Sequence, residues 1–253
     1  GGMLGSGMKL GTCALTIVVG YGIVCIYMCF MGMQGCDTGL PTAVMAGGSL
    51  GEKGGKYVVT RNGSALMAFT VPQEGAEAFH ITASHCDSPT FKIKEDPEIA
   101  DGPYVKLNVE GYGGMIMSTW LDRPLSVAGR LLVTENGHLA EKLVAIDGTM
   151  LVIPSVAIHM DRSVNQHKEW KVQKDMLPLY GMTGAKTPFM DVIAASAKVK
   201  AEDILAHDLI LYSRVPGTIW GEEREFISSP KLDDLQCAFA CFRGFTQGEK
   251  EKY

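Results

Sequence analysis

The pattern of apolar and polar residues predicts β-strands through most of the chain after Gly48. Two strand-like runs, KYVVT and ALMAFTV, flank Asn62-Gly63, a dipeptide typical of tight hairpin turns. Two more runs, RLLVT and HLAEKLVAI, flank Asn136-Gly137 and predict a second hairpin in the same way. The runs are densest in the middle of this region, so we expect many strands there and α/β character at its ends.

Several shorter segments complete this expected order. AFHITAS, which begins at Ala78, predicts a strand, and KLNVEGY is expected to pair with MIMSTWL through Gly113-Gly114. LVIPSVAIHM is an apolar run bounded by polar residues. Only MDVIAASAKV and the run from Leu235 to Phe242 have the pattern of helices.

The first part of the chain differs from the rest. No charged residue occurs from Leu10 to Met33, and this stretch is long enough to cross a bilayer as a helix. A misassembled or wrongly framed upstream segment would give a similar run, and both interpretations stay open. Because residues 1–46 have no polar face, we expect a poorly packed extension or an apolar helix projecting from the domain.

Composition narrows the class of protein. The chain has 253 residues, enough for one large domain or two modest ones. Hydrophobic residues make up 46% and charged residues 20%, which excludes a disordered chain. The net charge of −5 disfavours a general nucleic-acid binder. Seven cysteines without a CxxC pair are typical of reduced thiols, so we expect a cytoplasmic protein.

The sharpest candidate for chemistry is the segment SHCDSP at the end of the run AFHITAS. Residues two apart on a strand point to the same side, so His85 and Asp87 are expected to face one cavity. A metal-binding histidine commonly needs an acid nearby to orient it. The alternative is a histidine and an aspartate that bind loop backbone at a strand end.

Two other features are ambiguous on local grounds. Asp233 and Asp234 precede an apolar helix, where they could cap its N-terminus, or one of them could bridge two metal ions. His159 lies on an apolar run, where a histidine is more often a core residue than a ligand.

Taken in order, the segments resemble the aspartyl aminopeptidase family of dinuclear zinc metallopeptidases. The resemblance runs from about Leu50 to the end, and five blocks in the family's order make it specific. Its second metal motif, usually Arg-Leu-Asp-Asn, is Lys231-Leu232-Asp233-Asp234 here. The blocks are GGKYVVTRNGSALMAF, ITASHCDSPTFKIK, YGGMIMSTWLDRPLSVAGR, VIPSVAIHMDRSVN with the later KDMLPLYG, and GEEREFISSPKLDDLQCAFA.

The resemblance implies a fold and a division into domains. The fold is an α/β peptidase domain, incomplete in this chain, with an inserted β-rich dimerisation domain. Residues 48–100 correspond to the first part of the peptidase domain, 101–220 to the insertion and 221–253 to a truncated second part. Residues 1–47 form an apolar segment of uncertain status.

The resemblance also implies a reaction and roles for residues. Two zinc ions activate water, which removes the first residue, preferentially Asp or Glu, from a peptide with a free N-terminus. His85 ligates one metal, and Asp87 is a catalytic carboxylate that orients it or helps set the water. Asp233 bridges the metals. His159 reaches the site of a neighbouring subunit as a substrate contact or a metal ligand.

The same resemblance sets expectations for partners and completeness. It implies a homo-oligomer formed through the inserted domain, no nucleic-acid partner and no membrane. The Glu-Glu pair and the further Asp and His ligands that follow the second metal motif in the family do not occur between Asp234 and Tyr253. We therefore expect the chain by itself to be inactive. Two alternatives are a membrane-anchored binding protein and a non-catalytic assembly subunit.

Overall fold

The computed structural model describes residues 12–19, 56–61, 64–73, 78–166, 168–184 and 187–247. The chain divides into two compact units. Unit 1 comprises Gly1–Asp87 and Lys231–Tyr253, and unit 2 comprises Ser88–Pro230. Unit 2 includes the range 101–220 that the sequence assigns to an inserted domain, and that assignment stays a prediction.

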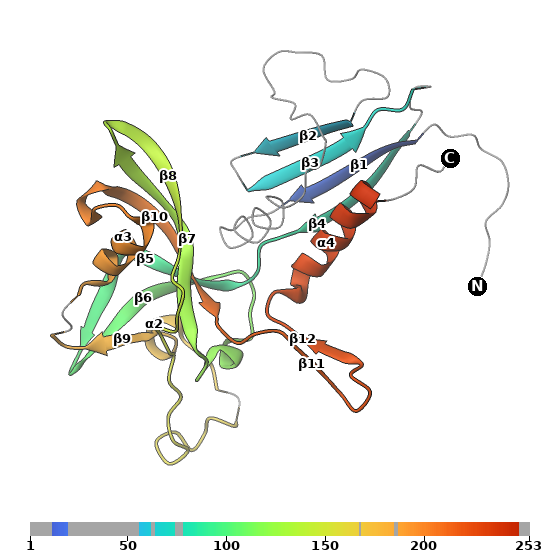
Figure 1. Ribbon diagram of the computed structural model, residues 1–253. Coiled ribbons are helices and arrows are strands. Elements are labelled where there is room, and N and C mark those ends of the chain that lie inside the picture. Colours follow the sequence, from blue (N-terminus) through green and yellow to red (C-terminus); the bar gives the residue numbers. More distant parts are fainter. Residues whose placement is uncertain are drawn as a thin grey trace. The chain divides into compact units, whose positions relative to one another are not determined.

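The described residues of unit 1 form a four-stranded sheet and one long helix (Figure 1). Strand β1 pairs with β3 in antiparallel and with β4 in parallel orientation, and β2 pairs with β3 in antiparallel orientation. Helix α4 lies against β4 and β1. The sheet order is β2 (Lys56–Arg61), β3 (Ala65–Thr70), β1 (Thr12–Val19) and β4 (Ala78–His85), and α4 spans Leu232–Gln247.

Strand β1 corrects the prediction made for the N-terminal stretch. A projecting helix or a poorly packed extension is wrong for Thr12–Val19, which is an interior strand with a neighbour on each side. In an interior strand, the backbone of a short apolar run rich in β-branched residues forms hydrogen bonds with both neighbouring strands. Its polar groups are therefore paired as fully as they would be in a helix. The rest of residues 1–46 lies outside the described residues.

Unit 2 is built on a six-stranded antiparallel sheet. Its order is β8 (His138–Ala145), β7 (Leu125–Glu135), β10 (Ile204–Ser213), β5 (Thr90–Asp101), β6 (Tyr104–Tyr112) and β9 (Leu179–Met182). The helices of unit 2 are η1 (Met117–Trp120), α2 (Val172–Asp175), α3 (Phe189–Ala197) and η2 (Ala201–Asp203), and a separate hairpin consists of β11 (Thr218–Trp220) and β12 (Phe226–Ser228).

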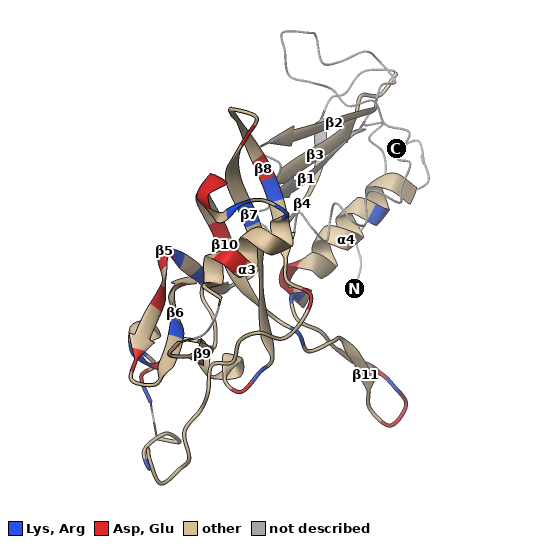
Figure 2. Cartoon of the chain, turned by 60° about the vertical axis from the view of Figure 1, so that its left-hand side comes forward, with Lys and Arg blue, Asp and Glu red and all other residues tan. Residues whose placement is uncertain are grey.

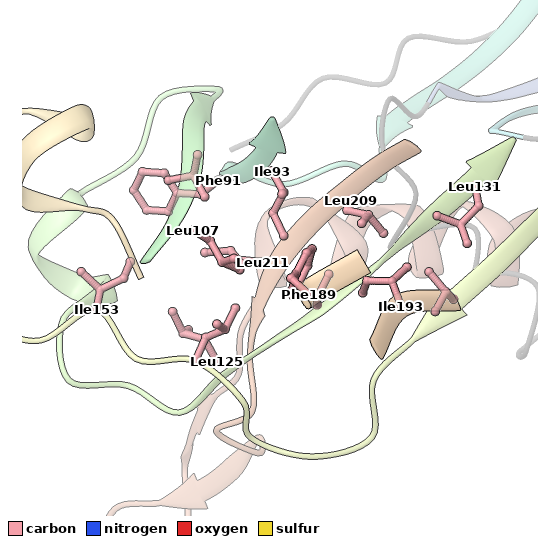
Figure 3. Packing of buried hydrophobic residues seen from close by; sticks show 14 of the residues in the cluster. Phe91, Ile93, Leu107, Leu125, Leu131, Ile153, Phe189, Ile193, Leu209 and Leu211 are labelled. Carbon is pink, nitrogen blue, oxygen red and sulfur yellow. The ribbon is translucent and has the colours of Figure 1, made fainter. Parts of the chain in front are cut away.

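The core of unit 2 lies between this sheet and helix α3 (Figure 3). Phe189 and Ile193 of α3 are completely buried with Leu125 and Leu209 of the central strands. At Gly129 strands β7 and β10 approach so closely that a Cβ atom would lie 2.3 Å from a backbone oxygen of β10. Only glycine allows this approach.

The local predictions for unit 2 succeed in most places. The hairpin RLLVT–HLAEKLVAI is confirmed as β7 and β8, and MDVIAASAKV is confirmed as helical by α3. The predicted strand MIMSTWL is wrong, because Met117–Trp120 forms a 3-10 helix whose Trp120 packs edge-on against Phe91. Strand β6 pairs instead with β5 and β9. Helix α2 was not predicted.

Among the residues that the structure describes, no helix is long and apolar enough to cross a membrane.

The position of β1 predicts that its backbone is essential to unit 1. Ile17 faces Met67 on one neighbouring strand and Ala83 on the other. Ile17→Pro removes a backbone donor and prevents close pairing, which costs about 1–3 kcal/mol for each partner left unsatisfied and exposes the strand edges. We expect a lower soluble fraction and a lower urea midpoint than for Ile17→Val. Equal solubility and midpoints for the two variants would show that β1 is not part of the sheet.

A buried histidine in unit 2 gives a prediction about pH. The His207 side chain is only 3% exposed, and Nε2 lies 3.7 Å from Glu95 Oε2. Burial lowers the pKa of His207, as does the charge of Lys92, while the charges of Glu95 and Asp208 oppose this and do not cancel it. The folded state therefore favours the neutral imidazole.

This lowered pKa makes unit 2 less stable in acid. As pH falls below about 6.5, the unfolded histidine binds a proton that the folded one resists, so the free energy of unfolding decreases. We expect His207→Leu to reduce the fall of the urea midpoint between pH 7 and pH 5. The exposed His138, changed to Leu, serves as the control and should leave that fall unchanged. An identical pH dependence in wild type and His207→Leu would contradict the prediction.

Candidate metal site at the end of strand β4

The candidate site begins where strand β4 ends. His85 is the last residue of β4, and its Nδ1 lies 3.1 Å from the backbone oxygen and 3.2 Å from Oδ1 of Asp87. A proton on Nδ1 is thus held by two acceptors, which leaves the lone pair of Nε2 to face outward. The prediction that His85 and Asp87 lie together on one side is confirmed.

The start of helix α4 supplies the other half of the site. Asp233 Oδ1 lies 3.2 Å from His85 Nε2, and Asp234 Oδ2 lies 3.8 Å from the same nitrogen. The His85 backbone N–H donates a hydrogen bond of 3.2 Å to Asp234 Oδ2 across a sequence separation of 149 residues. The predicted approach of Asp233 to His85 is therefore confirmed.

The two adjacent aspartates have different tasks. Both have non-helical backbone angles, so the regular helix begins at Leu235, as the sequence predicts. Asp234 accepts hydrogen bonds from Cys237, three residues later, which is the geometry of an N-cap. Asp234 therefore caps the helix, and Asp233 is left to face the imidazole. The sequence predicted a helix cap or a metal ligand at these two aspartates, but it did not show which residue has which role.

The charges of the site act on one another. Burial lowers the pKa of His85, but the hydrogen bond with the Asp87 backbone and the charges of Asp234 and Asp87 outweigh this effect, so the pKa is raised. The pKa of Asp234 is lowered, chiefly by the hydrogen bond from the Cys237 side chain and also by the backbone N–H and charge of His85. The site thus favours a positive charge beside its carboxylates.

The donor atoms at His85 and Asp233 fit a zinc ion. Zinc takes imidazole nitrogen and carboxylate oxygen at about 2.0–2.1 Å, so two ligands of a tetrahedral site lie roughly 3.3 Å apart. The observed Nε2–Oδ1 distance is 3.2 Å. The Asp233 side chain is 92% exposed.

The set of ligands is small. Within the described ranges, no group of three or more His, Cys, Asp or Glu side chains is arranged to hold a metal ion. His85 and Asp233 are two donors, whereas zinc sites in proteins use three or four protein ligands.

His159 belongs to unit 2 and forms part of an exposed turn. The expectation that it faces outward is confirmed, and its neighbours Ile158 and Met160 are also exposed, by 54% and 73%. Its exposure contradicts the alternative that His159 is a core residue.

Comparison with known proteins identifies the family. Residues 43–253 match the family described as aminopeptidase I zinc metalloprotease (M18). A probable M18 family aminopeptidase 2 of Clostridium novyi is 44% identical over 210 residues, which cover 79% of this chain and 48% of that protein. Aspartyl aminopeptidase 4 of Saccharomyces cerevisiae is 35% identical, with coverage of 79% and 46%. The chain thus spans about half the length of these relatives.

A comparison of structures agrees. The cryo-EM structure of the Ape4 and Nbr1 complex contains a chain that matches with a TM-score of 0.78 and 29% identity. The match covers 89% of this chain and 47% of that one. On the family match and the relatives together, this chain belongs to the M18 family of zinc metalloproteases, the aminopeptidase I family.

Proposed function

We propose that this chain is the metal-binding first half of a zinc aminopeptidase that removes N-terminal residues, chiefly Asp or Glu, from peptides. The observation that carries the proposal is the arrangement at His85, where Asp87 holds Nδ1 and Asp233 lies at Nε2. The names of the relatives from Clostridium novyi and Saccharomyces cerevisiae support the activity, and the second name supports the acidic preference.

Each residue of the site has a role in the proposal. His85 binds one zinc ion through Nε2. Asp87 accepts the Nδ1 proton, fixes the orientation of the ring and raises its basicity, as carboxylate partners of zinc-bound histidines do. Asp233 would be a second ligand through its exposed carboxylate, and in a two-metal site it would be the shared one. When bound, zinc polarises the scissile carbonyl and lowers the pKa of its water.

The remaining parts of the machinery come from the resemblance. A Glu-Glu pair would supply a ligand and the base that moves the proton to the leaving amine, and further Asp and His ligands would complete both metal sites. Among the described residues, no set of three or more such side chains is arranged to hold a metal ion. We therefore infer that residues 1–253 bind zinc weakly and do not turn over peptide by themselves.

The proposal also covers assembly and location. The protein forms a homo-oligomer through unit 2, and His159 of one subunit completes the site of its neighbour as a substrate contact or a ligand. A cytoplasmic location is consistent with Cys86, Cys237 and Cys241, none of which forms a disulfide bond.

Zinc binding by the chain tests the metal site directly. Loss of a ligand in His85→Ala or Asp233→Asn should weaken zinc binding at least about 10-fold, and Asp87→Asn should weaken it about 10- to 100-fold through the orientation of the ring. Competition with a chromophoric chelator measures the affinity. His138→Ala, in the exposed part of unit 2, is the matched control and should bind as wild type does. Unchanged affinity in His85→Ala would overturn the metal site.

Activity needs a complete subunit, which a chimera provides. Residues 43–253 replace the matching part of the Clostridium novyi relative, to which they are clearly similar. In this chimera, release of the N-terminal residue from a peptide that begins with Asp, compared with one that begins with Ala, reports the substrate preference. Equal rates for the two peptides would remove the acidic preference from the proposal.

The role of His159 can be assigned by mixing subunits. In the chimera, His159→Ala should lower kcat/KM about 10-fold or more without changing the thermal unfolding temperature, because the side chain is exposed. Mixed with a His85→Ala chimera, it should regain part of the activity, since one subunit then supplies the metal site and the other the histidine. Unchanged kinetics would remove His159 from the site, and no gain on mixing would place it in the site of its own subunit.

A further inference from the structure

His159 lies in an exposed stretch of unit 2, residues 155–161, called the histidine loop below. Residues 154–160 are all exposed, whereas Ile153, directly before them, is completely buried. The chain has no Asp, Glu, Lys or Arg between Asp147 and Asp161, and this stretch is tan in Figure 2. Burial and ion pairs therefore contribute little to the shape of the loop along its length, and its two ends must supply most of the restraint.

Asp122 holds the beginning of the histidine loop. Its Oδ1 accepts the backbone N–H of Ser155 at 2.8 Å, and its own backbone N–H donates to the oxygen of Ile153 at 2.9 Å. The hydrogen bonds from Ser155 lower the pKa of Asp122, so the carboxylate is charged near neutral pH and the contact is charge-assisted. Asp122 follows Leu121, which packs against the core and forms a β-bridge with Ile153. The first end of the loop is thus joined to the core through Asp122.

Lys168 holds the other end of the loop. Its Nζ lies 2.7 Å from Oδ2 of Asp161 and 3.8 Å from Oδ1 of Asp175 in helix α2. The same ammonium lies over the ring of Trp170, 4.5 Å from the ring centre, and Trp170 packs against the core. The side chains of Asp161, Lys168 and Asp175 are only 21%, 20% and 18% exposed, so water screens their charges less than those of a fully exposed pair. The second end is therefore also joined to the core.

Between these two contacts the loop makes one turn, in which the backbone N–H of Met160 donates to the oxygen of Ala157 at 2.8 Å. His159 lies inside this turn. An exposed segment of this kind loses conformational freedom when one of its side chains has to act at a fixed place. Contacts that hold both ends in advance reduce that loss, which is the general effect of preorganisation.

We propose that Asp122 and Lys168 are positioning residues, which hold the histidine loop and with it the His159 side chain in the conformation that the reaction uses. The proposal rests on the proposed function, in which His159 completes the site. Neither residue has to touch substrate or metal, because each acts through the loop. When either contact is lost, fewer molecules have the loop in the competent conformation, and the apparent affinity for whatever His159 binds falls by the same factor.

Amide hydrogen exchange in the full chain tests the first contact. Asp122→Gly removes the carboxylate, and glycine adopts the left-handed backbone of this residue, whose φ is 57°, without strain. The hydrogen-bonded amides of Ser155 and Met160 should then exchange about 10-fold faster or more, while those of β7 and β10 stay unchanged. Asp122→Asn keeps an acceptor oxygen and tolerates the same backbone, so it should stay within about twofold of wild type. Equal exchange in Asp122→Gly and wild type would overturn the proposal.

The same measurement tests the second contact. Lys168→Met keeps most of the side-chain length but removes the charge, so the Met160 amide should exchange faster, whereas Lys168→Arg keeps the charge and should exchange as wild type does. Lys142→Met is the matched control, because it breaks an ion pair of similar length, 2.8 Å to Glu135, on the hairpin of β7 and β8. Equal effects of Lys168→Met and Lys142→Met on the loop would remove Lys168 from the proposal.

Kinetics of the chimera show whether Asp122 acts through His159. Asp122→Gly should lower kcat/KM about 10-fold, and Asp122→Asn should keep most of the activity. In a His159→Ala background, Asp122→Gly should cause no further loss, since the side chain that it positions is gone. Equal losses in both backgrounds would show a merely structural role and overturn the proposal. Wild-type kinetics in His159→Ala alone would instead contradict the proposed function of that histidine, so the two failures give different results.

Discussion

One hydrogen bond joins the two parts of unit 1 on which the site depends, from the backbone N–H of His85 to the carboxylate of Asp234. It ties the end of a strand to the start of a helix that follows 149 residues later. Asp234 also caps that helix through Cys237, so one carboxylate sets both the beginning of α4 and its place beside β4. Because Asp233 directly precedes Asp234 in the chain, it also lies near the His85 imidazole. The candidate metal site follows from this structural contact.

The pairing of β1 with β4 has a similar importance for the strand end. β4 joins the sheet through its parallel partner β1, in a register that continues to the pair Val19 and His85. Without β1, the last residues of β4 would have no strand to pair with, and the position of the His85 imidazole would not be fixed. Strand β1 belongs to the N-terminal stretch whose sequence differs from the rest of the chain, and it supports the strand that carries His85.

Unit 2 combines a well-packed interior with two uncovered apolar surfaces. Phe189, Leu125 and Leu209 are completely buried, and the close approach at Gly129 leaves no space between the central strands. The hairpin of β11 and β12 and residues 156–162, by contrast, expose about half or more of their large apolar side chains. A unit with a sufficient core of its own does not need these exposed residues for folding.

The sequence by itself determined the hairpin of β7 and β8, helix α3, the shared side of His85 and Asp87, and the family, because each depends on neighbouring residues or on motif order. It misjudged Thr12–Val19 and MIMSTWL, since an apolar run suits a helix, a buried strand or an irregular segment until its partners are known. The division of tasks between Asp233 and Asp234 was likewise decided only by the tertiary structure. Two adjacent acids are equivalent in sequence, and a strand end brought in from 149 residues away makes them different.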